Sequence, residues 1–237
     1  MKTKKTLLVG LVICLTMLAV NCKKNQPGQE AIAQDFQWQF DQFADLRILR
    51  YQVPGFEGLT PKQKELIYYL SEAAAWGRDI IFDQNYKHNL TIRRTLDAIV
   101  EGYKGDRSDP QWEKFMIYTK RVWFSNGIHH HYSSDKFDPG FSPEYFAGLI
   151  KGSEGVEFPL GQGMSLDDLY TFLYPIMFDP SVDPKKVSQD ATKDLVKHSA
   201  VNFYEGVTQA EVEAYYKSIS KIFYPVVCIT NITIMND

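Results

Sequence analysis

The chain has 237 residues, and acidic residues outnumber basic ones by 29 to 26, which gives a formal net charge of −3. Its basic doublets are scattered along the sequence, so no concentrated basic face is expected. This charge pattern excludes nucleic acid as a partner, because nucleic-acid binding needs clustered Lys and Arg.

The first residues have the pattern of an export signal. Three lysines within the first five residues precede an apolar run from Leu7 to Val20. This run is too short for a membrane-spanning helix, which needs about 20 residues. Cys22 follows the sequence LAVN, so we expect residues 1–21 to be a lipoprotein signal and Cys22 to carry the lipid. The expected location is therefore outside the cytoplasm, anchored by lipid to a bacterial membrane on its periplasmic or cell-surface side. The alternative is an ordinary cleaved secretory signal.

Cysteine usage and composition define the segments that follow the signal. Cys14 belongs to the signal and Cys22 would carry lipid, so Cys228 has no partner for a disulfide. Residues 22–35 are mostly polar and include a proline and a glycine, which predicts a tether. Residues 36–220 then form the predicted globular part.

The globular part begins with two predicted strands and a long predicted helix. The segments FQWQFDQF and LRILRYQV, within residues 36–53, alternate aromatic or branched residues with polar ones, as half-buried strands do. The pair Thr60-Pro61 with Gln63 has the form of a helix start. Apolar residues then recur at steps of three and four as far as Ile81. This spacing predicts one helix of about twenty residues with one face in a core.

Further helix-start signals follow along the chain. Periodic apolar residues between Leu90 and Val100 predict a second helix. A capping residue followed directly by proline predicts a helix start at each of three sites: Asp109-Pro110, Ser142-Pro143 and Asp183-Pro184. A capping hydroxyl with an acid three residues later predicts two more, at Ser165 with Asp168 and at Thr208 with Glu211. The expected fold class is mainly α, or α+β with a minor β element near the amino terminus.

No motif for catalysis or metal binding is complete in the sequence. A zinc-peptidase helix needs a Glu directly after its first His, and none of the five histidines is followed by Glu. No Gly-x-Ser-x-Gly nucleophile motif occurs, although a Ser-His-Asp set assembled in space is left open. We interpret His88, in a predicted helix, and His198, near a predicted helix end, as surface or capping residues.

The run of three histidines at 129–131 is the most conspicuous local feature. In an extended segment His129 and His131 would point to the same side and could share a metal. Two ligands leave most of a zinc coordination shell empty, so weak binding is all that this pair predicts by itself.

Three long segments carry a resemblance to a known family. They are GLTPKQKELIYYLSEAAAWGRDIIFDQNYKHNLTIRRTL, VWFSNGIHHHYSSDKFDPGFSPEYF and HSAVNFYEGVTQAEVEAYY. They resemble the amino-terminal region of bacterial dipeptidyl peptidase III, a family of zinc exopeptidases, and the resemblance extends from about Phe36 to Lys217. It implies part of a two-lobed peptidase, in which dipeptides are removed from oligopeptide amino termini in a cleft between a helical zinc lobe and a lobe with a small β-barrel.

The resemblance places the zinc outside this chain. In the family, the ion is held by a His-Glu-x-x-x-His helix and by a glutamate from a second acidic helix, and both elements lie downstream of the last residue here. No catalytic or metal residue is therefore expected in this chain, and zinc is expected in the complete family enzyme without tight binding here.

The expected function is an amino-terminal fragment of the peptidase that is inactive by itself, so whether the chain counts as an enzyme is left open. The alternative is a non-catalytic extracytoplasmic lipoprotein that binds peptide or metal. The expected partners are an oligopeptide and a membrane.

The same resemblance assigns substrate-binding residues to the histidine run. Eukaryotic members have a Ser-Phe-Gly segment lining the cleft where the peptide amino end binds, and the spacing from Asn126 to Phe137 places it on His131, Tyr132 and Ser133. This chain departs from the family because Ser133 replaces the glycine and histidines replace the preceding residues. The aromatic face of Tyr132 suits packing against a peptide side chain and weak attraction to its ammonium. The alternative is a purely structural loop.

The final segment differs in character from the rest of the chain. Residues 221–237 read KIFYPVVCITNITIMND, an abruptly apolar stretch rich in β-branched residues. We expect an altered reading frame or an early stop here, because the family continues differently. The alternative is a genuine final strand.

Overall fold

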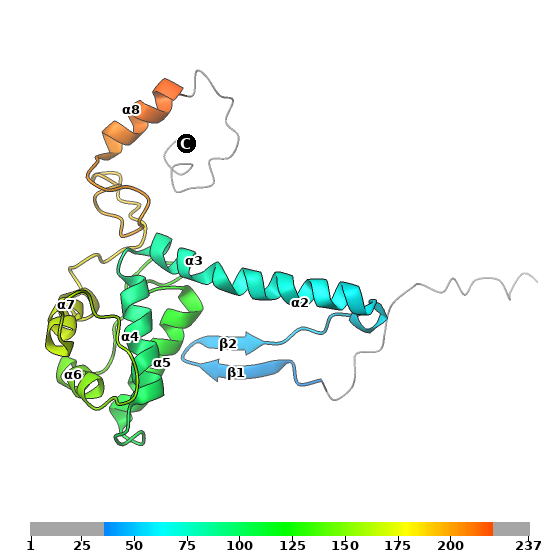
Figure 1. Cartoon of the computed structure of the whole chain (residues 1–237). Helices are drawn as coiled ribbons and strands as arrows, with labels where there is room; N and C mark the ends of the chain where they lie inside the picture. Colours follow the sequence, from blue (N-terminus) through cyan, green and yellow to red (C-terminus); the bar gives the residue numbers. More distant parts are fainter. Residues whose placement is uncertain (1–35, 220–237) are drawn as a thin grey trace, which may run out of the picture. The chain divides into compact units, whose positions relative to one another are not determined.

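The computed structural model describes residues 36–219 (Figure 1). The fold is mainly α with one small antiparallel sheet near the amino terminus, which confirms the predicted class. The predicted signal, the lipid-bearing Cys22, the tether at 22–35 and the tail at 221–237 all lie outside the described residues. Within residues 36–219, no helix has the length and apolar character needed to cross a membrane.

The described residues separate between Tyr68 and Tyr69 into two compact units. The first unit contains a hairpin of strands β1 (Gln39–Phe43) and β2 (Leu46–Leu49), followed by a 3-10 turn, η1 (Phe56–Gly58). The strands pair antiparallel with a register irregularity after Gln39, and Ala44 turns the chain with a left-handed φ of 48°. Both strands therefore lie where the alternating residues predicted them.

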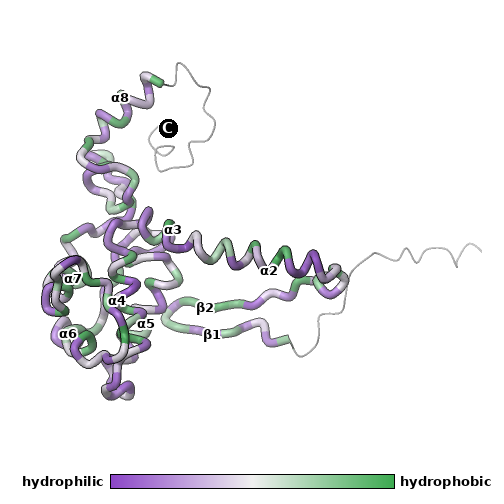
Figure 2. The backbone as a smooth tube through the Cα atoms, viewed as in Figure 1, coloured by the Kyte–Doolittle hydropathy of each residue, from purple (hydrophilic) through white to green (hydrophobic). Residues whose placement is uncertain are grey.

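Helix α2 (Pro61–Trp76) begins as predicted, but it differs from the prediction in length and in burial. The Thr60 hydroxyl accepts the backbone N–H of Gln63, and the Gln63 side chain accepts the backbone N–H of Thr60, so the two form a capping box. The helix ends before Gly77, and α3 (Arg78–Asn85) follows, so the single predicted helix is divided at a glycine. Apolar residues recur along α2 (Figure 2), yet none of its residues is buried. The expectation that this face packs into a core is wrong for the described part of the chain.

The second unit contains the remaining helices, and most begin at their predicted caps. Asp109 caps α5 by accepting the Gln111 N–H, and Ser142 caps α6 by accepting the Tyr145 N–H. The bounds are α4 (Asn89–Gly102), α5 (Pro110–Ser125), α6 (Pro143–Lys151), α7 (Leu166–Phe178) and α8 (Gln209–Ile219).

The core of this unit is formed where α4 packs against α3, α5 and α6, and where α6 packs against α7. The residues at the centre are aromatic and branched aliphatic side chains with no measurable exposure: Ile92, Leu96, Ile99, Phe115, Val122, Ile128, Phe146, Leu149, Leu169 and Leu173. Burial of a side chain of this size contributes about 1.5–3 kcal/mol, so these residues account for much of the stability of the unit. Among them, Ile128 directly precedes the histidine run and fixes its start to the core.

The helix predicted from Asp183-Pro184 is absent, and the chain from Asp179 to Thr208 contains no helix. Asp183 has a left-handed φ of 45°, unlike the capping residues Asp109, Ser142 and Ser165 at the starts of α5, α6 and α7. Its carboxylate accepts a hydrogen bond from the Tyr86 hydroxyl. This segment is instead held by hydrogen bonds from residues that are distant in the sequence, such as Tyr86 and His129.

His198, predicted near a helix end, lies in a turn where its Nδ1–H donates to the carbonyl of Asp194.

Candidate functional site

The chain enters the histidine run through a sharp turn at the end of α5. Asn126 caps the helix in the left-handed conformation with φ 53°, and Gly127 follows with φ 149°. A Cβ on Gly127 would lie 2.1 Å from Nδ2 of Asn89, so only glycine fits there. Asn89 is fully buried and accepts the N–H of Ile128 at 3.1 Å, while its amide donates to the carbonyl of Phe82 at 3.1 Å. This buried amide fixes the start of the histidine run against α3 and α4.

His129, the first histidine of the run, is buried and neutral. Its exposed fraction is 2%, and its Nε2–H donates to the backbone carbonyl of Asp183 at 2.8 Å. Burial lowers the pKa of His129 to about 4. Its Nδ1 is buried without a hydrogen-bond partner among the described residues. His129 therefore connects two distant segments of the chain and does not present its ring to solvent.

His130 and His131 form a compact turn with Tyr132. The Nδ1 atom of His130 accepts the backbone N–H groups of Tyr132 at 3.2 Å and of Ser133 at 3.1 Å. The ring of His131 stacks on His130 with centroids 4.5 Å apart, and its Nδ1 lies 3.4 Å from the hydroxyl of Ser125. Because the chain turns here, His129 and His131 have separate surroundings, and the extended geometry that would let them share a metal is not formed.

An open recess of about 400 Å³ lies beside this turn. One wall, which we call the turn wall, consists of residues 132–134 and includes Tyr132, whose exposed fraction is 86%. The second wall, the 185–193 wall, comes from the segment where a helix had been predicted. Its lining residues are Lys185, Val187, Ser188, Gln189, Asp190 and Lys193. Of the three residues predicted to bind substrate, Tyr132 and Ser133 line this recess and His131 is not among its lining residues, and their role in binding stays a prediction.

The charged groups of the recess are paired on the surface. The ammonium of Lys185 pairs with Asp135, and Lys193 pairs with Asp190 at 3.5 Å. The hydrogen bond from Lys185 lowers the pKa of Asp135, and hydrogen bonds from Thr192 lower the pKa of Asp190. Exposed pairs of this kind contribute about 0–1 kcal/mol each, so a charged ligand can displace either partner at little cost.

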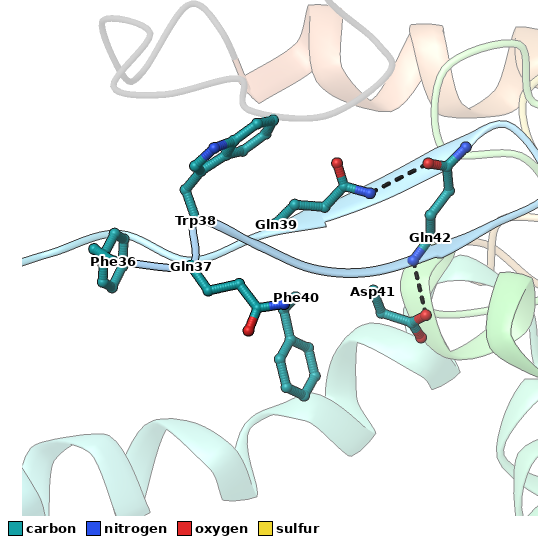
Figure 3. Close-up of a pocket in the computed structure, with 7 residues that line it drawn as sticks. All are labelled: Phe36, Gln37, Trp38, Gln39, Phe40, Asp41 and Gln42. Atoms are coloured by element: carbon teal, nitrogen blue, oxygen red, sulfur yellow. Dashed lines mark hydrogen bonds between the residues drawn. The ribbon is translucent and has the colours of Figure 1, made fainter. Parts of the chain in front are cut away.

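Two other hollows are less suited to ligand recognition. The larger, of about 620 Å³, lies along β1, and Figure 3 shows that all of its lining residues come from one extended stretch, Phe36 to Gln42. A site usually combines groups from several elements, and this hollow has only one. The other, of about 420 Å³, lies between Phe137 and Phe178, but the Lys136 ammonium at its wall already donates to the carbonyls of Ile176, Asp179 and Val182.

The described residues do not form a zinc site. No group of three or more His, Cys, Asp or Glu side chains between residues 36 and 219 is close enough to hold a metal ion. His88 packs edge-on between Tyr86 and Phe172 with centroids 5.0 and 5.1 Å away, and burial lowers its pKa. His88 occupies the N-cap position of α4, as the prediction of a capping residue allows, but its side chain makes no capping hydrogen bond and is partly buried against the two rings.

Sequence reasoning missed the 185–193 wall of the recess. The Asp183-Pro184 pair has the form of a helix start, so the sequence predicted a helix where the structure has a loop. A second signal was present, because Asp190 and Thr192 have the spacing of an Asx turn, and the Asp190 carboxylate does accept the Thr192 N–H at 3.1 Å. No local pattern, however, indicates that this loop lines the same recess as Tyr132.

The chain was compared with known proteins by family and by sequence. No model of a protein family matches it, and no curated protein matches it.

Proposed function

We propose that this chain is the amino-terminal part of a zinc-dependent dipeptidyl peptidase and contributes one wall of the substrate cleft. The sequence resemblance from about Phe36 to Lys217 supports the family. The observation that carries the proposal is that Tyr132 and Ser133, two of the three residues assigned to substrate by that resemblance, line one open recess.

The recess has groups that suit the amino end of an oligopeptide. The exposed ring of Tyr132 offers a face for a side chain or an ammonium group, and Asp190 offers a carboxylate. The hydroxyls of Ser133 and Ser134 can donate to peptide carbonyls, and Lys185 and Lys193 can pair with acidic groups further along the peptide. Binding would bury much of the Tyr132 ring, which favours association.

The proposed contribution of this chain is substrate binding and not hydrolysis. The zinc of the family belongs to helices that are not part of the described residues, and we assign no catalytic or metal-binding role to His129, His130 or His131. The proposal includes export and attachment to the bacterial membrane through a lipid on Cys22, which would place the recess outside the cytoplasm.

Titration of the full chain with a fluorescent oligopeptide bearing a free amino terminus tests this proposal. We expect Tyr132→Ala to weaken binding about tenfold, because an aromatic contact of this kind contributes about 1 kcal/mol or somewhat more. Tyr215→Ala, at a ring on α8 that is 61% exposed, is the matched control and should leave binding unchanged. Zinc affinity of the chain should be the same for both variants. Equal peptide binding by wild type and Tyr132→Ala would refute the assignment.

A stand-alone lipoprotein that binds peptide or metal without catalysis is the second candidate. It is favoured by the fact that both walls of the recess come from residues 132–193 of one compact unit, so binding needs no other lobe. Sequencing the coding DNA past the last codon separates the two candidates, since a His-Glu-x-x-x-His helix in either shifted frame supports the peptidase. Tight one-to-one zinc binding with dipeptide release by this chain would contradict both.

A further inference from the structure

The two walls of the recess are joined by backbone hydrogen bonds at its base. The N–H of Lys136, just after the turn wall, donates to the carbonyl of Pro184 at 3.0 Å, and the N–H of Lys186 donates to the carbonyl of Ser134 at 2.8 Å. These two bonds cross from one segment to the other over a sequence separation of about fifty residues. The spacing of the walls therefore depends on where Pro184 and its neighbours are held.

Asp183 is the point at which the second segment is fixed. Its backbone is strained, with φ 45°, and two buried side chains hold it: Nε2–H of His129 donates to its carbonyl at 2.8 Å, and the Tyr86 hydroxyl donates to its carboxylate at 2.6 Å. His129 and Tyr86 are 2% and 1% exposed, and their rings meet edge to face with centroids 5.6 Å apart. A left-handed non-glycine residue persists only where its surroundings hold it in place.

The neighbouring anchor acts on a different part of the segment. The Lys136 ammonium donates to the carbonyls of Ile176, Asp179 and Val182, so it secures the chain as far as Val182. The 185–193 wall begins three residues later. The contacts of Asp183 and the two backbone bonds act between that anchor and the wall, while the wall itself is also held by the Lys185–Asp135 ion pair and by the N–H groups of Ala200 and Val201, which donate to the carbonyls of Lys185 and Lys186.

From these contacts we infer that His129 is a positioning residue, which holds the 185–193 wall against the turn wall through Asp183 and so sets the width of the recess. Loss of the imidazole donor removes one of the two side-chain hydrogen bonds that hold Asp183, which favours opening of the segment. The consequence for ligand binding rests on the proposed function, whereas the effect on the walls does not.

Hydrogen exchange on the full chain measures the effect on the walls directly. We compare His129→Leu, which removes the donor, with His129→Gln, whose side-chain N–H can replace it. In His129→Leu the amides of Lys136 and Lys186 should exchange about tenfold faster relative to the amide of Tyr103, which donates to Ile99 at the end of α4. His129→Gln should restore most of the protection.

The exchange rate could instead increase equally at all three amides, or the Leu and Gln variants could give the same exchange rates. Either result would show that His129 only fills space and would overturn the inference. Should His129→Leu fail to fold, Tyr86→Phe removes the other hydrogen bond to Asp183 and keeps the ring. It should give the same local pattern with a smaller increase, and an unchanged pattern in Tyr86→Phe would likewise overturn the inference.

Peptide titration of the same variants distinguishes this inference from the proposed function. If the exchange pattern is as expected and no form of the chain binds peptide, the positioning role stands and the proposed function fails. If the wild type binds peptide, His129→Leu should bind about tenfold more weakly and His129→Gln nearly normally. Unchanged affinity in His129→Leu would overturn the inference while leaving the proposed function intact.

Discussion

Three adjacent histidines of identical chemistry have three different surroundings in this protein. His129 is buried and donates to a backbone carbonyl 54 residues away, His130 accepts two backbone N–H groups of its own turn, and His131 stacks on His130. A run of identical residues therefore does not act as one site. The surroundings of each ring, and not its identity, decide its partners.

The buried state of His129 predicts a pH dependence of stability. Its folded pKa is about 4, below the ordinary value of 6.5, so as the pH falls from 6.5 to 4 the unfolded chain takes up a proton that the folded chain does not. We expect the free energy of unfolding to fall by about 1.4 kcal/mol per pH unit, or about 3 kcal/mol over this range, from this group. Below pH 4 its contribution becomes constant.

The groups around His129 do not reverse this sign. The Asp183 carboxylate favours the imidazolium, but the ammonium groups of Lys136 and Lys186 oppose it, and Tyr86 is neutral because burial raises its pKa. Chemical denaturation of wild type and His129→Gln at several pH values checks the prediction. The difference between their free energies of unfolding should change with pH in the window from 6.5 to 4, and a difference independent of pH would contradict it.

At the scale of single elements, the helix starts follow local chemistry closely. α7 begins with a capping box in which the Ser165 hydroxyl accepts the Asp168 N–H at 3.1 Å and the Asp168 carboxylate accepts the Ser165 N–H at 2.9 Å. Such contacts lie within four residues, so they form whatever the rest of the chain does. Gly77 is a contrasting case. Apolar residues continue to recur at steps of three and four on both sides of it, but helix α2 ends before it.

The cap of α7 gives a prediction for a single substitution. We expect Ser165→Ala to lower the free energy of unfolding by about 1 kcal/mol, because the first-turn N–H of Asp168 loses its acceptor. Thr171→Ala on the same helix is the control, since its hydroxyl donates only to the carbonyl of Asp167 on an exposed face and should change stability by less than about 0.5 kcal/mol. Urea unfolding of the two variants measures the difference, and equal effects would show that the cap is not the cause.

At the scale of the whole molecule, burial is unevenly distributed between the helices. α3 to α7 supply most of the hydrophobic core, whereas α2 has no buried residue and exposes Leu70 and Trp76 at 59% and 85%. An amphipathic helix of this kind derives little stability from tertiary packing. Its apolar side chains are therefore in contact with solvent.

This distribution predicts which substitutions the molecule tolerates. Leu70→Gln and Trp76→Gln should each change the free energy of unfolding by less than about 0.5 kcal/mol, because neither side chain is buried. Both should lower the binding of a hydrophobic dye by the folded chain. Phe82→Ala on α3, at 1% exposure, is the matched contrast and should cost about 3–5 kcal/mol. A large loss of stability in Trp76→Gln would show that α2 is packed in solution.

The sequence by itself determined the elements whose signals are local. Caps at Thr60, Asp109, Ser142 and Ser165 each predict a helix that is present, and alternating residues predict the hairpin. These predictions succeed because a cap or an alternating strand depends on residues within a few positions of one another.

Only the tertiary structure decided the course of the chain after α7 and the character of the candidate site. The Asp183-Pro184 pair has the local form of a helix start, yet Tyr86 and His129, 97 and 54 residues away, hold Asp183 in a left-handed conformation that differs from the caps at the starts of α5, α6 and α7. The same contacts bury His129 and place the 185–193 wall at the same recess as Tyr132. Long-range hydrogen bonds from the buried side chains of Tyr86 and His129 outweigh a local preference of about 1 kcal/mol, and no periodic pattern in the sequence indicates them.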